Sequence, residues 1–312
     1  MSFGFDRIIS DYLKSDEFLK QSYTPGIESE NFYLPGAYDM SLWDERWDVP
    51  AFWGNHITHI NTHHVRVMCP YVYGILNADH EILQKTYENV VFLPRSDMGW
   101  VDLMINWDDF FSKIYDICDG ETIFIAWPRD VKYFRSNMPD AKVFAMGTHR
   151  YNDLNWSYNL IKLIKRSKQI YFASFGTASV LSSMFDVKVR FYDPGKVFDI
   201  GASPSGNQYC PEFQTEQWNS TIKYFQDVLS FDGLSEDKKY LIHNFLSLDK
   251  YQTPEDLAET LRTRTSGPYS NCERLNEYIP VSPTEKTVQV YESIRIFQNQ
   301  DIESRKKETA NS

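Results

Sequence analysis

Residues 167–195 read SKQIYFASFGTASVLSSMFDVKVRFYDPG and predict a strand, a tight turn, a helix and a second strand. The apolar run 170–173 lies between polar residues, which is typical of a short strand buried on both faces of a sheet. Apolar residues at 180, 181, 184 and 185 follow the spacing of a helix packed on that sheet. Val187, Val189 and Phe191 then alternate with polar residues, as in a strand. The stretch therefore predicts a βαβ unit of a parallel sheet.

The turn in this unit is Ser174, Phe175, Gly176 and Thr177. We expect Gly176 to supply a positive φ and Thr177 to cap the following helix. A helix N-terminus carries partial positive charge and unpaired N–H groups, so this turn, together with Ser179, predicts a phosphate site. The alternative is that the Gly-Thr pair only makes a tight connection and an ordinary cap.

Further strands and helices are expected before this unit. Apolar runs at 89–94, 121–127 and 141–146 predict strands, and periodic stretches at 107–118 and 154–164 predict helices. From residue 89 to 192 the expected order is strand, helix, strand, strand, helix, strand, helix, strand. This alternation predicts the α/β class, with a Rossmann-like parallel sheet.

Polar and cationic residues follow four of the expected strands. Because the carboxyl ends of parallel strands share one edge of a sheet, we expect these residues to converge there on an anionic, phosphorylated ligand. An alternative for Arg95 and Arg129 is an ion pair with the adjacent Asp97 or Asp130. The residues predicted to bind the ligand are Arg95, Ser96, Arg129, His149, Arg150, Ser174, Gly176, Thr177 and Ser179.

A cluster of histidines precedes the expected sheet, at positions 56, 59, 63 and 64. Imidazole titrates near neutral pH, so one of them is a candidate general base. A metal site and purely structural histidines are the alternatives, although no H-E-x-x-H motif is present. Around the cluster, residues 1–20 predict an amphipathic helix, residues 65–73 suggest strands and residues 79–88 look helical.

The composition is that of a globular protein, with 42% hydrophobic and 16% aromatic residues. A net charge of −11 argues against unaided, non-specific binding to nucleic acid or to an anionic membrane. The 4 cysteines lie far apart in the sequence, which fits free thiols in a reducing compartment. No signal peptide pattern and no long apolar stretch is seen, so we expect a cytoplasmic protein without membrane insertion, in the host cytoplasm if a phage encodes it.

The expected organisation has four parts. Residues 1–86 form an N-terminal region and residues 87–217 a Rossmann-like domain, which the resemblance given next makes the acceptor side and the donor-binding domain. Residues 218–300 form a helical region that packs back on both, with helices at 216–230, 235–248, 254–263 and 284–299, and residues 301–312 form a disordered tail.

The stretch YNLIKLIKRSKQIYFASFGTASVLSSMFDVKVRFYDPG, residues 158–195, resembles the donor-binding half of GT-B-type glycosyltransferases, and the likeness extends over residues 89–195. In that fold a short Gly/Ser/Thr turn opens a helix at the phosphates of a nucleotide-sugar. Leu181-Ser182-Ser183 is also similar to a segment of some bacterial sialyl- and polysaccharide-type transferases. The resemblance implies a nucleotide-sugar donor as co-substrate, with no other cofactor. It also implies an acceptor hydroxyl, either on a hydroxymethylated base of phage DNA or on a surface glycan.

Glycosyl transfer requires neutralisation of the phosphate leaving group and removal of the acceptor proton. Arg95, Arg129 and Arg150 are candidates for the first role, beside the Gly176 turn. His63, His64 and Asp97, in that order, are candidate catalytic bases. No D-x-D motif stands out, so no essential metal ion is expected. The alternatives are a non-catalytic nucleotide- or phosphosugar-binding protein and a phosphate-ester hydrolase.

Overall fold

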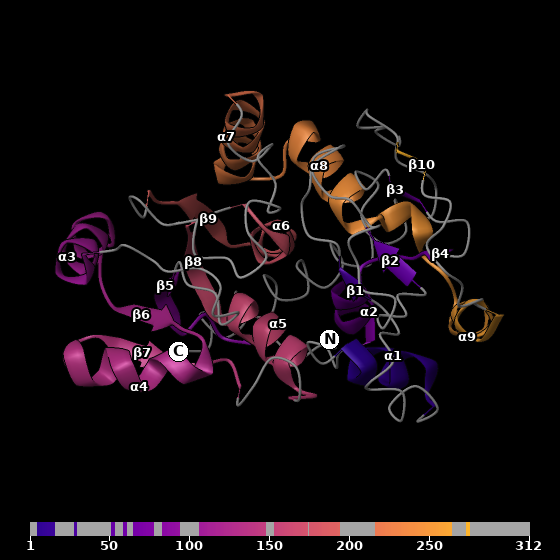
Figure 1. The fold of residues 1–312 in the computed structure, drawn as a ribbon, viewed down its shortest axis with the longest axis horizontal. Helices are drawn as coiled ribbons and strands as arrows, with labels where there is room; N and C mark the ends of the chain where they lie inside the picture. Colours follow the sequence, from indigo (N-terminus) through magenta and orange to yellow (C-terminus); the bar gives the residue numbers. More distant parts are fainter. Residues whose placement is uncertain are drawn as a thin grey trace, which may run out of the picture.

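The computed structural model (Figure 1) describes these residues of the chain: 5–15, 28–29, 51–53, 59–60, 65–77, 83–93, 106–147, 153–173, 175–193, 216–263 and 273–274.

A parallel sheet of five strands organises the structure. Its order is β7-β6-β5-β8-β9, and every neighbouring pair runs parallel. The α/β class and the parallel sheet predicted from the sequence are confirmed. The strands are β5 (Tyr87–Phe92), β6 (Thr122–Ile125), β7 (Lys142–Phe144), β8 (Ser167–Phe172) and β9 (Lys188–Phe191).

A helix connects each strand to the next along the chain. The first two connections carry the chain from the middle of the sheet to one edge, and the third returns it across β6 and β5 to β8. The last connection leads to β9 at the opposite edge. The connecting helices are α3 (Trp107–Ile117), α4 (Pro128–Asn137), α5 (Trp156–Arg166) and α6 (Thr177–Ser182).

Both faces of the sheet are buried, by different helices. Val91 and Tyr171 point into an apolar cluster with α3 and α4. Their neighbours Val90 and Ile170 point into a second cluster that includes α5 and α6. Successive strand residues face opposite sides, so continuous apolar runs are what such strands require. The prediction of doubly buried strands is confirmed.

One connecting helix was missed by the sequence prediction. Residues 128–130 were expected at the end of a strand, with no helix before the next strand, whereas the structure forms α4 from Pro128 to Asn137. Pro128 occupies the first turn, where its fixed φ suits a helix and its missing N–H costs no hydrogen bond. Few apolar residues mark this helix, and Phe134 is the apolar side chain that it buries fully. Arg129 therefore lies in the first turn of α4 rather than in a loop.

A second difference lies before the sheet. Tyr71 and Tyr73, which suggested a strand, belong to helix α2 (Pro70–Asn77). Residues 70–75 are all buried, so the helix lacks the polar stripe that reveals helical periodicity in a sequence. The helix expected over 79–88 is not seen in its described part, because residues 83–86 are irregular and β5 begins at Tyr87.

Helices from the C-terminal half lie beyond the β9 edge of the sheet and beyond α6, as Figure 1 shows. Of the expected C-terminal helices, 284–299 lies outside the described residues, whereas the structure contains α7 (Glu216–Ser230), α8 (Glu236–Leu246), a 3-10 turn (Leu248–Lys250) and α9 (Pro254–Thr263). α7 lies along β9, and α8 packs on α6.

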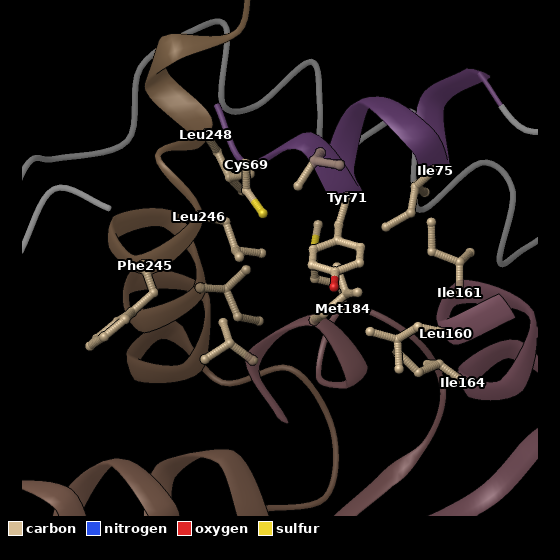
Figure 2. Close-up of a cluster of buried hydrophobic side chains, with 14 of the residues drawn as sticks. Cys69, Tyr71, Ile75, Leu160, Ile161, Ile164, Met184, Phe245, Leu246 and Leu248 are labelled. Atoms are coloured by element: carbon tan, nitrogen blue, oxygen red, sulfur yellow. The ribbon is translucent and has the colours of Figure 1, made fainter. Parts of the chain in front are cut away.

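The cluster in Figure 2 joins three parts of the chain. Cys69 and Tyr71 lie between α5 on one side and the end of α8 on the other. Met184, just after α6, also reaches this cluster. The Cys69 N–H donates to the carbonyl of Leu246 at 3.0 Å, which fixes the start of α2 to the end of α8. The core is therefore continuous from the N-terminal helices to the C-terminal ones.

The N-terminal helix α1 (Phe5–Leu13) packs against α2, α5 and α9. The Tyr12 hydroxyl donates to the carbonyl of Gln252 at 2.7 Å, and the Tyr158 hydroxyl donates to the Asp11 carboxylate at 2.8 Å. Five short strands complete the described elements: β1 (Glu28–Ser29), β2 (Ala51–Trp53) and β4 (Val65–Arg66) form a parallel sheet, and β3 (His59–Ile60) pairs antiparallel with β10 (Glu273–Arg274).

Gly74 allows α1, α2 and α5 to approach closely. A Cβ added there would lie 2.8 Å from Ile8 Cδ1 and 3.1 Å from Ile161 Cδ1. We expect Gly74→Val to lower the free energy of unfolding by about 1–3 kcal/mol, because it overpacks this contact. In Gly74→Ala the two methyl ends can shift and the helix propensity improves by about 1 kcal/mol, so its stability stays close to wild type. Urea unfolding of the two variants measures both effects, and equal stability of Gly74→Val and wild type would contradict the prediction.

Buried tyrosines predict a loss of stability at alkaline pH. Burial raises the pKa of Tyr171 to about 12 and raises the pKa of Tyr192 well above its ordinary value. Both side chains stay neutral in the fold at a pH where an unfolded tyrosine, with a pKa of about 10, ionises. The contribution of these two neutral side chains to the free energy of unfolding is thus complete below pH ~10 and is lost as the pH rises above that value. When the pH is raised from 8 to 11, the free energy of unfolding measured in urea should fall by about 1.4 kcal/mol less for Tyr192→Phe than for wild type. An equal loss in both proteins would show that Tyr192 does not contribute.

Candidate functional site

The carboxyl edge of the parallel sheet is the candidate site. The chain leaves β5, β6, β7 and β8 at this edge, and the order β7-β6-β5-β8-β9 reverses direction between β5 and β8. The helix after β5 lies on one face and the helix after β8 on the other, as the two apolar clusters show. At such a reversal the two loops diverge and leave a crevice, where open α/β sheets bind ligands.

The turn from β8 into α6 borders this reversal point. Gly176 is the N-cap residue of α6, with φ −175° and ψ 173°, so its backbone is extended. The expected positive φ at Gly176 and the expected cap at Thr177 are therefore wrong, and Thr177 is the first helical residue. A Cβ added to Gly176 would meet no described atom within 4 Å. Neither the backbone nor the described neighbours require glycine here. Because Gly176 has no side chain, a ligand can approach the backbone of the turn closely.

Ser179 shapes this turn from inside the protein. It is fully buried, its hydroxyl accepts from the Gly176 N–H at 3.0 Å, and the hydroxyl donates to the Gly176 carbonyl at 2.7 Å. The Ser179 and Val180 N–H groups also donate to that carbonyl, each at 3.0 Å. The side chain therefore fixes the Gly176 backbone, and a contact of Ser179 with phosphate stays a prediction.

Phe175 anchors the same turn on the C-terminal helices. Its ring lies 5.1 Å from the ring of Phe225 on α7 and 4.9 Å from that of Phe245 on α8, and these two rings are 5.3 Å apart. Phe175 is 7% exposed. The residue beside Gly176 thus fills an aromatic pocket of two distant helices, which holds the turn in place.

A tyrosine joins the two sides of the reversal point below the loops. Tyr192, just after β9, donates from its N–H to the carbonyl of Phe172 at 3.0 Å and from its hydroxyl to the carbonyl of Phe92. Burial raises the pKa of this hydroxyl, so it is a structural donor rather than a base. The ends of β5, β8 and β9 are thereby linked.

Most of the predicted site residues fall outside the part of the chain that the structure describes. Gly176, Thr177 and Ser179 are described and share one turn, with Thr177 partly exposed. For Arg129 the structure describes the backbone in α4 but not the side chain. Those outside the described ranges are His63, His64, Arg95, Ser96, Asp97, His149, Arg150 and Ser174. Arg95, Ser96 and Asp97 follow within four residues of Leu93, the last described residue after β5.

The sequence analysis missed an aromatic pair at the same edge. Trp127, at the N-cap of α4, stacks on Trp156, the first residue of α5, with ring centroids 5.4 Å apart and an interplanar angle of 11°. Trp127 was counted as the end of a strand, whereas β6 ends at Ile125. One feature of the sequence pointed to this pair. Trp127 stands at the end of an expected strand, and Trp156 stands near the start of an expected helix.

Neither a metal-binding cluster nor a membrane-spanning helix occurs among the described residues. Within those ranges no three His, Cys, Asp or Glu side chains gather closely enough to hold a metal ion. No helix in the described part is both long and apolar enough to cross a membrane.

No protein-family model, no curated protein sequence and no solved structure matches the chain.

The Ser179 hydroxyl gives a testable prediction with a control on the same helix. Ser182 is equally buried, but its hydroxyl donates to the carbonyl of Ala178 at 2.7 Å and does not touch Gly176. We expect Ser179→Ala and Ser182→Ala each to lower the free energy of unfolding by about 1–2 kcal/mol. Only Ser179→Ala should speed hydrogen exchange at the Gly176 N–H, because it alone removes that group's acceptor. Similar exchange at Gly176 in both variants would contradict the role given to Ser179.

Proposed function

We propose that the protein is a nucleotide-sugar-dependent glycosyltransferase with a Rossmann-like, GT-B-like donor half. The observation that carries the proposal is the reversal of strand order between β5 and β8. The chain following β5 holds Arg95, Ser96 and Asp97, and the chain following β8 holds Ser174, Gly176 and Thr177. The residue types suited to a phosphorylated ligand thus follow the two strands that border the crevice of an α/β sheet.

The donor diphosphate is proposed to bind at the Gly176 turn. The N-terminus of a helix carries partial positive charge and favours an anion. The open position at Gly176 supports close approach of a phosphate to the backbone. Arg95, Arg129, His149 and Arg150 follow neighbouring strand ends and would balance the charge on the leaving diphosphate.

The acceptor is proposed to lose its proton to a base from the chain outside the described ranges. His63, His64 and Asp97 are the candidates, because imidazole and carboxylate groups act as general bases. A hydroxymethylated base of phage DNA and a surface glycan remain the two proposed acceptors. The proposed scheme uses no metal ion and no cofactor beyond the nucleotide-sugar.

Each region of the chain has a proposed role. Residues 1–86 would face the acceptor and residues 87–217 would bind the donor. Residues 218–300 would support the donor turn, in line with the contact of Phe175 with α7 and α8. Residues 301–312 have no role in this scheme.

Thermal denaturation with a panel of nucleotide-sugars tests the donor site. A bound donor at 100 times its Kd should add about 2.7 kcal/mol of stability. Gly176→Val is the diagnostic variant, since its backbone is extended and the added Cβ meets no described atom within 4 Å. We expect this variant to unfold at the wild-type urea concentration yet to bind the donor at least about 10-fold more weakly, since it covers the turn.

The outcomes separate the alternatives. No stabilisation by any nucleotide-sugar, or full binding by Gly176→Val, would contradict the proposed donor site. Turnover of the donor at the same rate without acceptor would instead indicate a hydrolase. Activity should persist in a chelating buffer, and a loss that added metal restores would contradict the metal-independent scheme.

A further inference from the structure

The stacked Trp127 and Trp156 rings meet across the carboxyl edge of the sheet. Trp127 opens α4, which packs in the cluster on one face, and Trp156 opens α5, which packs on the other. Among the described residues neither ring belongs to the two apolar clusters that fill these faces. The pair is therefore a separate aromatic feature above β6 and β7.

The chain leaving β7 is fixed beside this pair. A Cβ added to Gly147 would lie 2.2 Å from Asp153 Oδ2 and 3.3 Å from Trp156 Cε3, so a side chain there would displace the Asp153 carboxylate and crowd the Trp156 ring. The Asn159 side chain donates to the carbonyl of Met146 at 2.5 Å. Gly147 therefore lies beside Trp156, and the Trp156 N–H donates to the carbonyl of Asp153 at 3.1 Å.

Trp127 is the outer ring of the pair. Trp156 is 2% exposed, whereas Trp127 keeps part of its surface exposed. An indole offers a ligand a flat apolar surface, and purine and pyrimidine bases stack on such surfaces whatever their hydrogen-bonding edge.

The position of the pair fits the length of a nucleotide. The pair lies at β6 and β7, and the reversal point lies between β5 and β8. Two strand intervals separate these places, or about 10 Å at the usual spacing of parallel strands. An extended nucleoside diphosphate spans a comparable length from its base to its terminal phosphate.

We propose that the base of the donor nucleotide stacks on Trp127 while its diphosphate binds at the Gly176 turn. This inference rests on the proposed function and adds the base subsite to it. It makes the preferred ligand a nucleoside diphosphate rather than a sugar phosphate or free pyrophosphate, because the base contributes a contact of its own. The base then lies over β6 and β7, near Gly147 at the end of the described chain after β7.

The test compares ligands with and without a base by calorimetric titration. The probes are uridine diphosphate, adenosine diphosphate and inorganic pyrophosphate, each with wild type, Trp127→Leu and Trp127→Phe. We expect Trp127→Leu to weaken binding of the tighter nucleotide by about 5- to 100-fold, the range of one base–aromatic stack. Pyrophosphate affinity should stay unchanged, and Trp127→Phe should recover most of the loss.

An exposed aromatic elsewhere provides the matched control. Tyr115 on α3 is 45% exposed and packs edge-on against Phe124. Tyr115→Leu removes an exposed ring of the same sheet domain, away from the carboxyl edge, and should leave nucleotide affinity at the wild-type value. A second measurement uses only wild type: proton NMR of the bound nucleotide should show its base protons shifted upfield by the ring current of a stacked indole.

Each outcome bears on a different claim. If wild type binds neither nucleotide, the proposed function fails and this inference fails with it. If wild type binds a nucleotide and Trp127→Leu binds it equally, the donor site stands and the base subsite is overturned. Equal weakening of nucleotide and pyrophosphate would assign Trp127 a structural role and also overturn the proposal. If Trp127→Leu does not fold, Trp127→Phe and the NMR shift decide, and unshifted base protons overturn it.

Discussion

The contact of Phe175 with Phe225 and Phe245 fixes the turn on which the candidate site depends. A turn between strand and helix is commonly held by the helix it opens, but α6 has only 6 residues. Its few hydrogen bonds would leave a short helix marginal without tertiary packing. The aromatic pocket on α7 and α8 supplies that packing, and Ser179 completes it from below. The open side of Gly176 therefore lies on a rigid support.

The sheet itself follows from how its strands are buried. The adjacent residues Val90 and Val91 point to opposite faces of the sheet, and so do Ile170 and Tyr171. A chain with such strands must place helices on both sides, and right-handed connections then require the return of the chain across the sheet after β7. The reversal point between β5 and β8 is a consequence of this requirement. The candidate site thus arises from the same constraint as the core.

The sequence predicted features that depend on local pattern. Strand β8 and helices α7 and α9 have continuous apolar runs or clear periodicity, and the structure contains them at or near the expected bounds. Helix α2 was missed because it is buried all round, and α4 because its apolar residues are few. The backbone of Gly176 depends on Ser179 and on the packing of Phe175, and the Trp127 pair joins residues far apart in sequence. Such tertiary contacts leave no periodic trace in the chain.

The contact between Tyr12 and Gln252 bears on how the chain reaches this structure. The hydrogen bond joins residues 240 positions apart, and α1 packs against both α2 and α9. Helix α1 leaves the ribosome before its partner α9, which lies about 240 residues further along the chain. Contacts of such long separation carry a large entropy cost and slow the search for the native state. Ile8 and Ile9 on the apolar side of α1 are buried in the finished protein, and the part of this side that α9 covers stays exposed until α9 has been made, which favours chaperone binding during that interval.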